Sequence, residues 1–198
     1  MEPFEGTSPQ PMQVFREWLS LAEKSEPNDP NAAALATATR EGVPSVRMVL
    51  VKGAEDRGVR FFTNRGSQKG EELLQNPEAA LCLHWKSTRR QVRFAGTVQQ
   101  LSREETAEYF HSRSRGSQIA AAISSQSRPL PSRDALNTAV RAYTAELGDR
   151  EVPLPEDWTG FLLVPRQVEF WSDGKDRLHD RMLFTRAGEG WTQTRLYP

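Results

Sequence analysis

The stretch AALCLHWKSTRRQVRFAGTVQ, residues 79–99, decides the fold class that we expect. Two runs rich in apolar residues, 79–85 and 91–99, flank a short polar turn at 87–90. Strands joined by so short a turn run antiparallel. The sequence therefore predicts a β-hairpin in the middle of the chain.

Further strands and helices are predicted on both sides of this hairpin. The strands are 33–39, 45–52 and 59–63 before it, and 161–171, 182–185 and 191–196 after it. The helices are 12–24, 67–75, 102–111, 118–123 and 132–147. Because helices do not alternate regularly with strands, a doubly wound parallel sheet is disfavoured. Closure removes the edges of an antiparallel sheet, so we expect a mainly β (α+β) fold, an antiparallel barrel with peripheral helices.

Length and composition bound the class of protein. The chain has 198 residues, which suits one domain, and we assign it to 12–198, with 1–11 disordered or loosely attached. The formal net charge is zero, so nothing points to nucleic-acid binding. No apolar run is long enough for a membrane span, and no secretory signal is evident. The single cysteine, Cys82, excludes an internal disulfide and reads as a small buried residue. We expect a cytoplasmic protein.

Acidic residues are absent from three basic stretches, 57–70, 79–103 and 109–133. Such segregation in a neutral protein favours a site for a compact anion such as phosphate. The alternative is chance segregation with charge pairing on helix surfaces.

Two of these regions carry patterns that suit phosphate binding. In FTNRGSQK, residues 62–69, a strand leads through a Gly-containing turn into a helix, whose free amides can bind an anion. Tyr109, Arg113 and Ser117 recur four residues apart and would share one helix face, unless Gly116 breaks the helix. An ordinary capped helix and a solvated helix face are the alternatives.

The run RLHDR, residues 177–181, lies just downstream of Trp171. A guanidinium offers a planar fork of donors, and an indole offers a flat π face. Together they suit a planar, anionic, aromatic ligand, whereas a solvated charged turn is the alternative. Motifs of other catalytic classes, such as GxSxG, HExxH, CxxC and GxGxxG, do not occur.

Several segments, in this order, resemble the pyridoxine (pyridoxamine) 5′-phosphate oxidase family. They are RMVLVK at 47–52, FFTNRGSQK at 61–69, RQVRFAG at 90–96, EYFHSRSRGSQIAAAISSQS at 108–127, VPLPEDWTGF at 152–161 and VEFWSDGKDRLHDR at 168–181. The resemblance covers residues 31–198, and its specificity comes from the shared order of the segments.

The resemblance implies an FMN-binding split β-barrel of Greek-key type that works as a homodimer with flavin sites at the subunit interface. It implies oxidation of pyridoxine 5′-phosphate or pyridoxamine 5′-phosphate to pyridoxal 5′-phosphate. O2 is then the electron acceptor and H2O2 the by-product, and the amine substrate also releases ammonia. Such chemistry needs no protein nucleophile, because the cofactor carries it.

The resemblance also implies roles for individual residues. Arg177 and His179 would be the catalytic pair beside the substrate ring. The substrate, including its phosphate, would be bound by Lys52, Tyr109, Arg113 and Ser117 together with that pair. The FMN site would comprise Arg47, Met48, Val49, Leu50, Val51, Lys52, Phe62, Thr63, Gln68, Lys69, Gln91, Gln126, Ser127, Trp171 and Arg181. No metal is implied.

The sequence departs from the family pattern in three places. Gln68 stands where the family usually has Arg, which exchanges a charged fork for a neutral amide and could loosen FMN. Phe62 stands where a Tyr is usual. The N-terminal segment lacks the Arg and Tyr residues that often cover the substrate. Two alternatives therefore stay open: a related FMN oxidase of phenazine biosynthesis, and a non-catalytic protein that binds flavin or pyridoxal phosphate.

Overall fold

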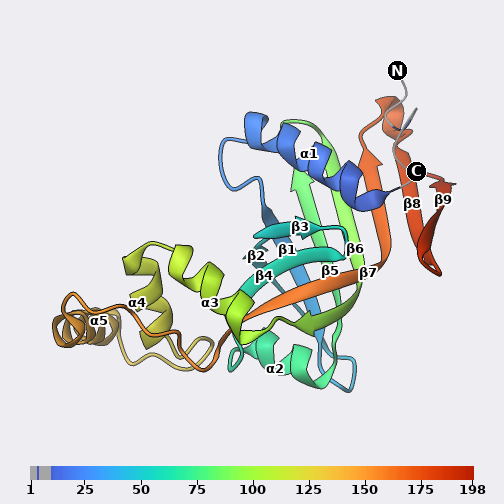
Figure 1. The fold of residues 1–198 in the computed structure, drawn as a ribbon. Coiled ribbons are helices and arrows are strands. Elements are labelled where there is room, and N and C mark those ends of the chain that lie inside the picture. The colour runs from blue at the N-terminus through green and yellow to red at the C-terminus, as the bar shows by residue number, and fades with distance from the viewer. Residues whose placement is uncertain (1–3, 5–9) are drawn as a thin grey trace.

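The computed structural model describes residue 4 and residues 10–198. Within these residues, nine strands form one antiparallel sheet, with neighbours in the order β2-β1-β5-β6-β7-β4-β3 and with β8 and β9 added beside β7 (Figure 1). The strands are β1 Ala32–Ala38, β2 Pro44–Leu50, β3 Gly53–Glu55, β4 Gly58–Asn64, β5 Glu78–Trp85, β6 Arg90–Gln100, β7 Trp158–Ser172, β8 Asp180–Ala187 and β9 Gly190–Leu196. The predicted hairpin is β5–β6. Strand β3 was not predicted, because three residues are too short for a periodic pattern.

The long strand β7 organises the sheet. Its first half pairs with β4, its second half pairs with β8, and β6 pairs with it throughout. A bulge between Ala95 and Gly96 lets β6 follow the bend, and a Cβ at Gly96 would lie 2.1 Å from the carbonyl oxygen of Val164. The sheet curls until β2 contacts β4. The predicted antiparallel barrel is thereby confirmed as a partly closed one.

The barrel encloses the main core. Helix α1, Pro11–Ser25, covers one opening and inserts Phe15 between Trp85 and Phe94, with ring centroids 6.3 and 4.9 Å away. Phe4 is buried and stacks on Trp18. The remaining residues of the segment expected to be loose, 1–3 and 5–9, lie outside the described part of the chain.

The cysteine lies on the outer face of the barrel wall. Cys82 keeps partial exposure, because it alternates along β5 with the inward-facing Leu81 and Leu83. The prediction that it is buried was therefore too strong.

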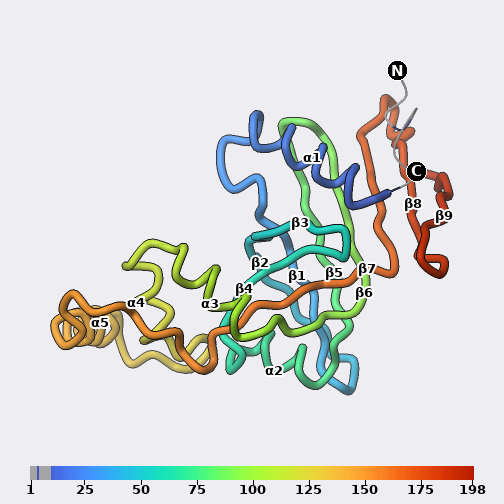
Figure 2. The backbone as a smooth tube through the Cα atoms, in the orientation of Figure 1, coloured from blue at the N-terminus to red at the C-terminus, as the bar shows by residue number. Residues whose placement is uncertain are grey.

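Three helices form an arm that extends from one side of the barrel (Figures 1 and 2). They are α3 Arg103–Ser112, α4 Arg115–Ile123 and α5 Arg133–Leu147. A second core of Phe110, Ile119, Leu147, Val152 and Trp158 joins the arm to the start of β7. Helix α2, Gln68–Gln75, lies apart from the arm, at the end of the barrel away from α1.

Tyr109, Arg113 and Ser117 do not share one helix face, because two helices are present here, as predicted. Helix α3 ends at Ser112, Arg113 is extended, and Ser114 caps the new helix α4, so the break precedes Gly116. The Ser114 hydroxyl accepts from the Ser117 amide and thereby starts α4 earlier than the predicted residue 118. No helix of the described residues has the length and apolarity needed to cross a membrane.

Candidate active site

A cavity of about 580 Å³ lies where the arm meets the barrel. This volume suits a small organic ligand. Strands β2 and β4, the start of α2 and the α3–α4 joint contribute its walls. The lining residues are Met48, Val49, Leu50, Lys52, Phe62, Thr63, Asn64, Lys69, Tyr109, Arg113, Ser114, Ser117, Ala120, Ala121, Ser124, Gln126 and Trp158.

One wall of the cavity is aromatic. Phe62 stacks on Tyr109 with ring centroids 4.0 Å apart, and on Trp158 at 5.4 Å. Burial raises the pKa of the Tyr109 hydroxyl, so it stays a neutral donor. Phe62, which stands where the family usually has Tyr, has no hydroxyl and therefore needs no hydrogen-bond partner within this stack.

Arg113 forms a cationic corner beside this wall. Its guanidinium lies over the Trp158 ring, 4.9 Å from the centroid. Its Nη1 is buried and has no hydrogen-bond partner within the described residues. Burial lowers the pKa of Arg113. The ordinary pKa of a guanidinium is so high that Arg113 nevertheless stays charged. A buried donor without a partner is costly, so this atom points to a bound anion.

The N-terminus of α4 reinforces this corner. Ser114 and Ser117 both line the cavity, and their hydroxyl oxygens are 2.9 Å apart. Free amides at a helix N-terminus favour negative charge. The break between α3 and α4 therefore brings two hydroxyls, a helix N-terminus and a guanidinium to one place, which suits a phosphate ester.

A second cation in the cavity lining is Lys69. Lys69 is buried in the first turn of α2, and its ammonium donates to Thr63 Oγ1 at 3.2 Å, Ser67 Oγ at 3.3 Å and Gln126 Oε1 at 3.0 Å. Burial lowers the pKa of Lys69, and the nearby positive charge of Arg47 lowers it further. These three hydrogen-bond partners are neutral and Glu72 acts on Lys69 only through its charge, so the ammonium can bind a second anion.

Arg47 is not among the residues that line the cavity. Its guanidinium donates to the Leu35 carbonyl at 3.3 Å and to the hydroxyls of Thr37 and Ser45, and it pairs with Glu72 at 3.3 Å. Gln68 donates to the other oxygen of Glu72 at 2.9 Å. Gln68, which stands where the family usually has Arg, therefore forms its hydrogen bond with the Glu72 carboxylate.

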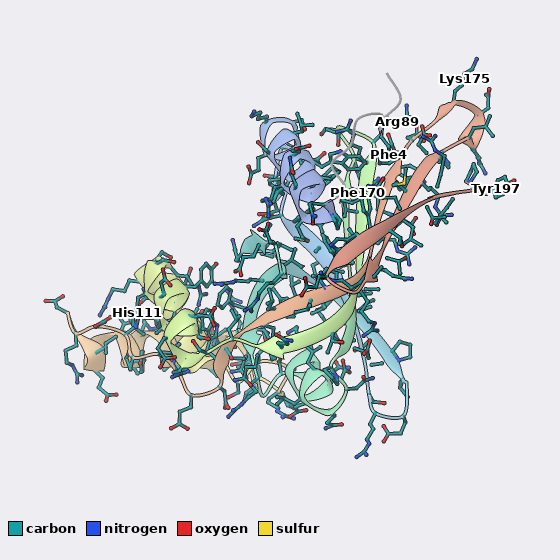
Figure 3. The ribbon with its side chains drawn as sticks, turned by 45° about the vertical axis from the view of Figure 1, so that its right-hand side comes forward. Phe4, Arg89, His111, Phe170, Lys175 and Tyr197 are labelled. Atoms are coloured by element: carbon teal, nitrogen blue, oxygen red, sulfur yellow. The ribbon has the colours of Figure 1, made fainter. Side chains whose placement is uncertain are left out.

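Five other predicted residues, Gln91, Trp171, Arg177, His179 and Arg181, do not line this cavity, and we call them the C-terminal group. Gln91 of β6, Trp171 of β7 and Arg181 of β8 are neighbours across three strands. His179 lies against Trp171, with ring centroids 4.7 Å apart. Arg181 donates to the Tyr197 carbonyl at 3.0 Å and pairs with the buried Glu169 at 2.8 Å. This C-terminal group ends the sheet on the side opposite the arm, as the positions of Lys175 and His111 indicate in Figure 3.

A tight turn precedes His179. Asp176 and Arg177 have positive φ angles of 54° and 64°, which ordinary residues adopt at an energetic cost. A Cβ at Gly174 would lie 1.9 Å from the Leu178 carbonyl oxygen, so the turn requires glycine there. The Arg177 side chain is exposed. Such strain in an exposed, cationic turn is typical of a binding element.

The sequence-predicted site therefore divides in two within one chain. Eleven predicted residues share the cavity: Met48, Val49, Leu50, Lys52, Phe62, Thr63, Lys69, Tyr109, Arg113, Ser117 and Gln126. Gln91, Trp171, Arg177, His179 and Arg181 do not line it. Val51 is buried in the core, and Ser127 is exposed beside Gln126.

Sequence reasoning missed part of the cavity wall. Trp158 lies within VPLPEDWTGF, a segment that carries the family resemblance, so it could have been found. Asn64, Ser114 and Ser124 also lie within segments that carry the resemblance, but their side chains occur in any turn or cap, so residue type alone did not single them out.

The cavity suits FMN together with a phosphorylated substrate. Its lining holds the cations Lys52, Lys69 and Arg113, which suit phosphate groups, together with apolar and aromatic side chains, which suit flat rings.

Comparison with protein families and relatives agrees with these features. The family model for pyridoxamine 5′-phosphate oxidase matches residues 21–145, and that for the pyridoxine 5′-phosphate oxidase C-terminal dimerisation region matches 158–198. The pyridoxine/pyridoxamine 5′-phosphate oxidase of Chelativorans sp. (strain BNC1) is 54% identical, over 96% of this chain and 91% of its own. That of Gluconobacter oxydans is 53% identical, over 95% and 94%.

Solved structures support the same fold. PhzG from Burkholderia lata 383, in complex with tetrahydrophenazine-1-carboxylic acid, is 32% identical with a TM-score of 0.94, over 100% of this chain and 97% of its own. An FMN-binding protein related to pyridoxamine 5′-phosphate oxidase, from Nostoc punctiforme, is 19% identical with a TM-score of 0.77, over 100% and 99%, and shows the fold alone. The chain is an FMN-dependent split-barrel protein and belongs to the pyridoxine/pyridoxamine 5′-phosphate oxidase family.

Proposed function

We propose that this protein oxidises pyridoxine 5′-phosphate and pyridoxamine 5′-phosphate to pyridoxal 5′-phosphate, with FMN as cofactor and O2 as electron acceptor, in the cytoplasm. The observation that carries the substrate class is the buried, partnerless Nη1 of Arg113 at the N-terminus of α4. A phosphate ester would give that atom its missing partner, and Ser117 and Lys52 add donors to the lining of the same cavity. The names of the relatives support the same substrates.

FMN supplies the two-electron acceptor that no amino-acid side chain offers. Lys69, Thr63 and Gln126 would hold its phosphate, since their polar atoms converge at one end of the cavity. Met48 and Leu50 of β2 would contact the flavin ring from the barrel side. Arg113 would fix the substrate phosphate at the other end and thereby orient the substrate ring for reaction.

The C-terminal group completes the site from a second copy of the chain in this proposal. Its cations and the Trp171–His179 pair lie far from the cavity of their own chain, and a dimerisation region matches 158–198. Exposed apolar side chains on β2, Val46, Met48 and Leu50, offer a surface that a partner can cover. A symmetric dimer would thus bring Arg177 and His179 of one subunit beside Arg113 of the other.

Turnover tests the activity. The purified protein, supplied with FMN, should convert both phosphorylated vitamers to pyridoxal 5′-phosphate and release one peroxide for each product, with ammonia from the amine alone. Unphosphorylated pyridoxine is the matched control and should react poorly, because Arg113 then lacks its anion. FMN binding without turnover would contradict the activity and favour the non-catalytic alternative.

The shared site has its own test. Arg113→Ala and Arg177→Ala should each retain only a few per cent of wild-type activity or less when assayed alone. In a mixture of unfolded chains refolded together, mixed dimers would hold one intact site, so roughly a quarter of wild-type activity should return. If both residues acted within one chain, the mixture would stay inactive.

The phenazine alternative rests on the similarity to PhzG. A phenazine precursor carries no phosphate ester, and its single carboxylate offers fewer acceptor oxygens to Arg113, Ser117 and Lys52 than a phosphate ester does. Oxidation of tetrahydrophenazine-1-carboxylic acid, with both vitamers left unchanged, would favour that alternative over ours.

A further inference from the structure

The segment that joins α4 to α5 crosses the phosphate end of the cavity. We call residues 124–128 the strap. Ser124 and Gln126 of the strap line the main cavity, and they also line a second cavity of about 340 Å³ beside it. The strap therefore forms part of the wall between the two cavities, next to Lys69.

The strap is held by polar contacts at three points. Asn64 donates to the Ser124 carbonyl at 3.4 Å. The oxygen Oε1 of Gln126 accepts from Thr63 at 2.9 Å and from Lys69 at 3.0 Å. Arg128 donates to the Gly66 carbonyl at 3.1 Å and pairs with the carboxylate of Glu71.

None of the strap residues is buried. All five are exposed, so packing contributes little to their position. The Arg128 amide donates to the Ser125 carbonyl at 3.0 Å and closes a turn in which Ser127 has a φ of +70°. The turn keeps its own shape, whereas the side-chain contacts of Gln126 and Arg128 fix its position against Lys69 and α2.

We propose that the strap gates exchange of the flavin nucleotide, and that Arg128 is a positioning residue which, through Glu71, keeps Gln126 against Lys69. We call the ion pair between Arg128 and Glu71 the latch. The inference rests on the proposed phosphate site at Lys69. With the latch intact, the strap separates the phosphate end of the main cavity from the second cavity. With the latch open, the two cavities merge, and FMN enters and leaves through the second one.

The expected effect is modest, because both side chains of the latch are about half exposed, 56% and 46%. An exposed ion pair and one charged hydrogen bond together correspond to FMN release about three to ten times faster. Salt screens exposed pairs, so wild-type release should quicken with ionic strength, whereas release from a variant without the pair should change less.

The test uses holoprotein and measures FMN release by flavin fluorescence polarisation after dilution into excess apoflavodoxin. The variants are Arg128→Gln, Glu71→Gln and the double variant, which together form a double-mutant cycle. Arg128→Lys keeps the charge without the planar fork and should restore part of the slow release. Arg141→Gln is the matched control. It removes the same charge from the arm, and Arg141 donates only to Thr138, within α5, among the hydrogen bonds of the described residues.

Both single variants should release FMN faster, the double variant should be no faster than the faster single one, and Arg141→Gln should match wild type. Release at the wild-type rate from Arg128→Gln and Glu71→Gln, with FMN still bound, would overturn the gate and leave the proposed function intact. Additive effects in the double variant would refute the latch. If the wild-type protein binds no FMN, the gate and the proposed cofactor site both fail.

Discussion

Removal of the Glu72 carboxylate should destabilise the apoprotein strongly, although the residue lies on an outer helix. Glu72 is 6% exposed and accepts from Ser45 at 2.6 Å, from Gln68 at 2.9 Å and from Thr37. It also pairs with Arg47, whose side chain is 19% exposed. In Glu72→Ala, this guanidinium loses its counter-ion.

Loss of one partner of a buried ion pair costs about 3–5 kcal/mol. Because Arg47 and Gln68 both keep contact with solvent, we expect the lower end, about 3 kcal/mol. For a chain of this length that free energy corresponds to a fall in Tm of roughly 6–12 °C. Glu72→Gln keeps an acceptor and should lose less, about 1–2 kcal/mol.

The effect should also depend on pH. The three hydroxyl and amide donors and Arg47 lower the pKa of Glu72 below its ordinary value, although burial opposes them. A carboxyl group whose folded pKa is lowered stabilises the protein above its unfolded pKa, and that contribution disappears as the pH falls through the folded pKa. The difference between wild type and Glu72→Ala should therefore be full at neutral pH and shrink in acid.

The assay is urea unfolding of the apoprotein at one fixed protomer concentration, since the stability of an oligomer depends on concentration. Glu71→Ala is the control: its neighbouring carboxylate is 46% exposed and should change stability by at most about 1 kcal/mol. Equal losses for the two variants would refute the claim that Glu72 is a buried counter-ion.

Two further predictions concern the ends of the cavity. Arg113→Gln should lower kcat/KM for the phosphorylated vitamers about 30- to 100-fold, the equivalent of about 2–3 kcal/mol in lost charged hydrogen bonds; flavin absorbance should be unchanged, and a loss of bound FMN would contradict the assignment. Because burial lowers the pKa of Lys69, FMN affinity should fall as the pH rises through that lowered pKa, where the ammonium loses its charge. Titration of Lys69→Met with FMN should show weaker binding that does not depend on pH in this range. An equal fall of affinity with pH in the variant would assign the pH dependence to another group.

Local patterns in the sequence predicted most of the secondary structure. The hairpin β5–β6, the helix α1 and the capped start of α3 follow from alternation, from helical spacing and from a capping box, all of which act between near neighbours. The three-residue strand β3 and the early start of α4 were missed. Each depends on pairing or capping that leaves no periodic signal.

The candidate site was predicted only in part, for a different reason. The resemblance named residues in the cavity and in the C-terminal group, but the distance between these groups depends on how β7 pairs with β4 at one end and with β8 at the other. The unpaired Nη1 of Arg113 and the diversion of Arg47 to Glu72 likewise arise from contacts between segments far apart in the chain.

The sequence by itself determined the class of fold, the family, and which side chains can bind anions and rings, because those properties belong to residue types and to their order. Only the tertiary structure decided which of the cations line the cavity, which are paired with buried carboxylates, and that the predicted site residues fall into two separate groups in one chain. The physical reason is that burial and ion pairing depend on distances across the sheet, and these are set when the sheet curls and the arm packs against it.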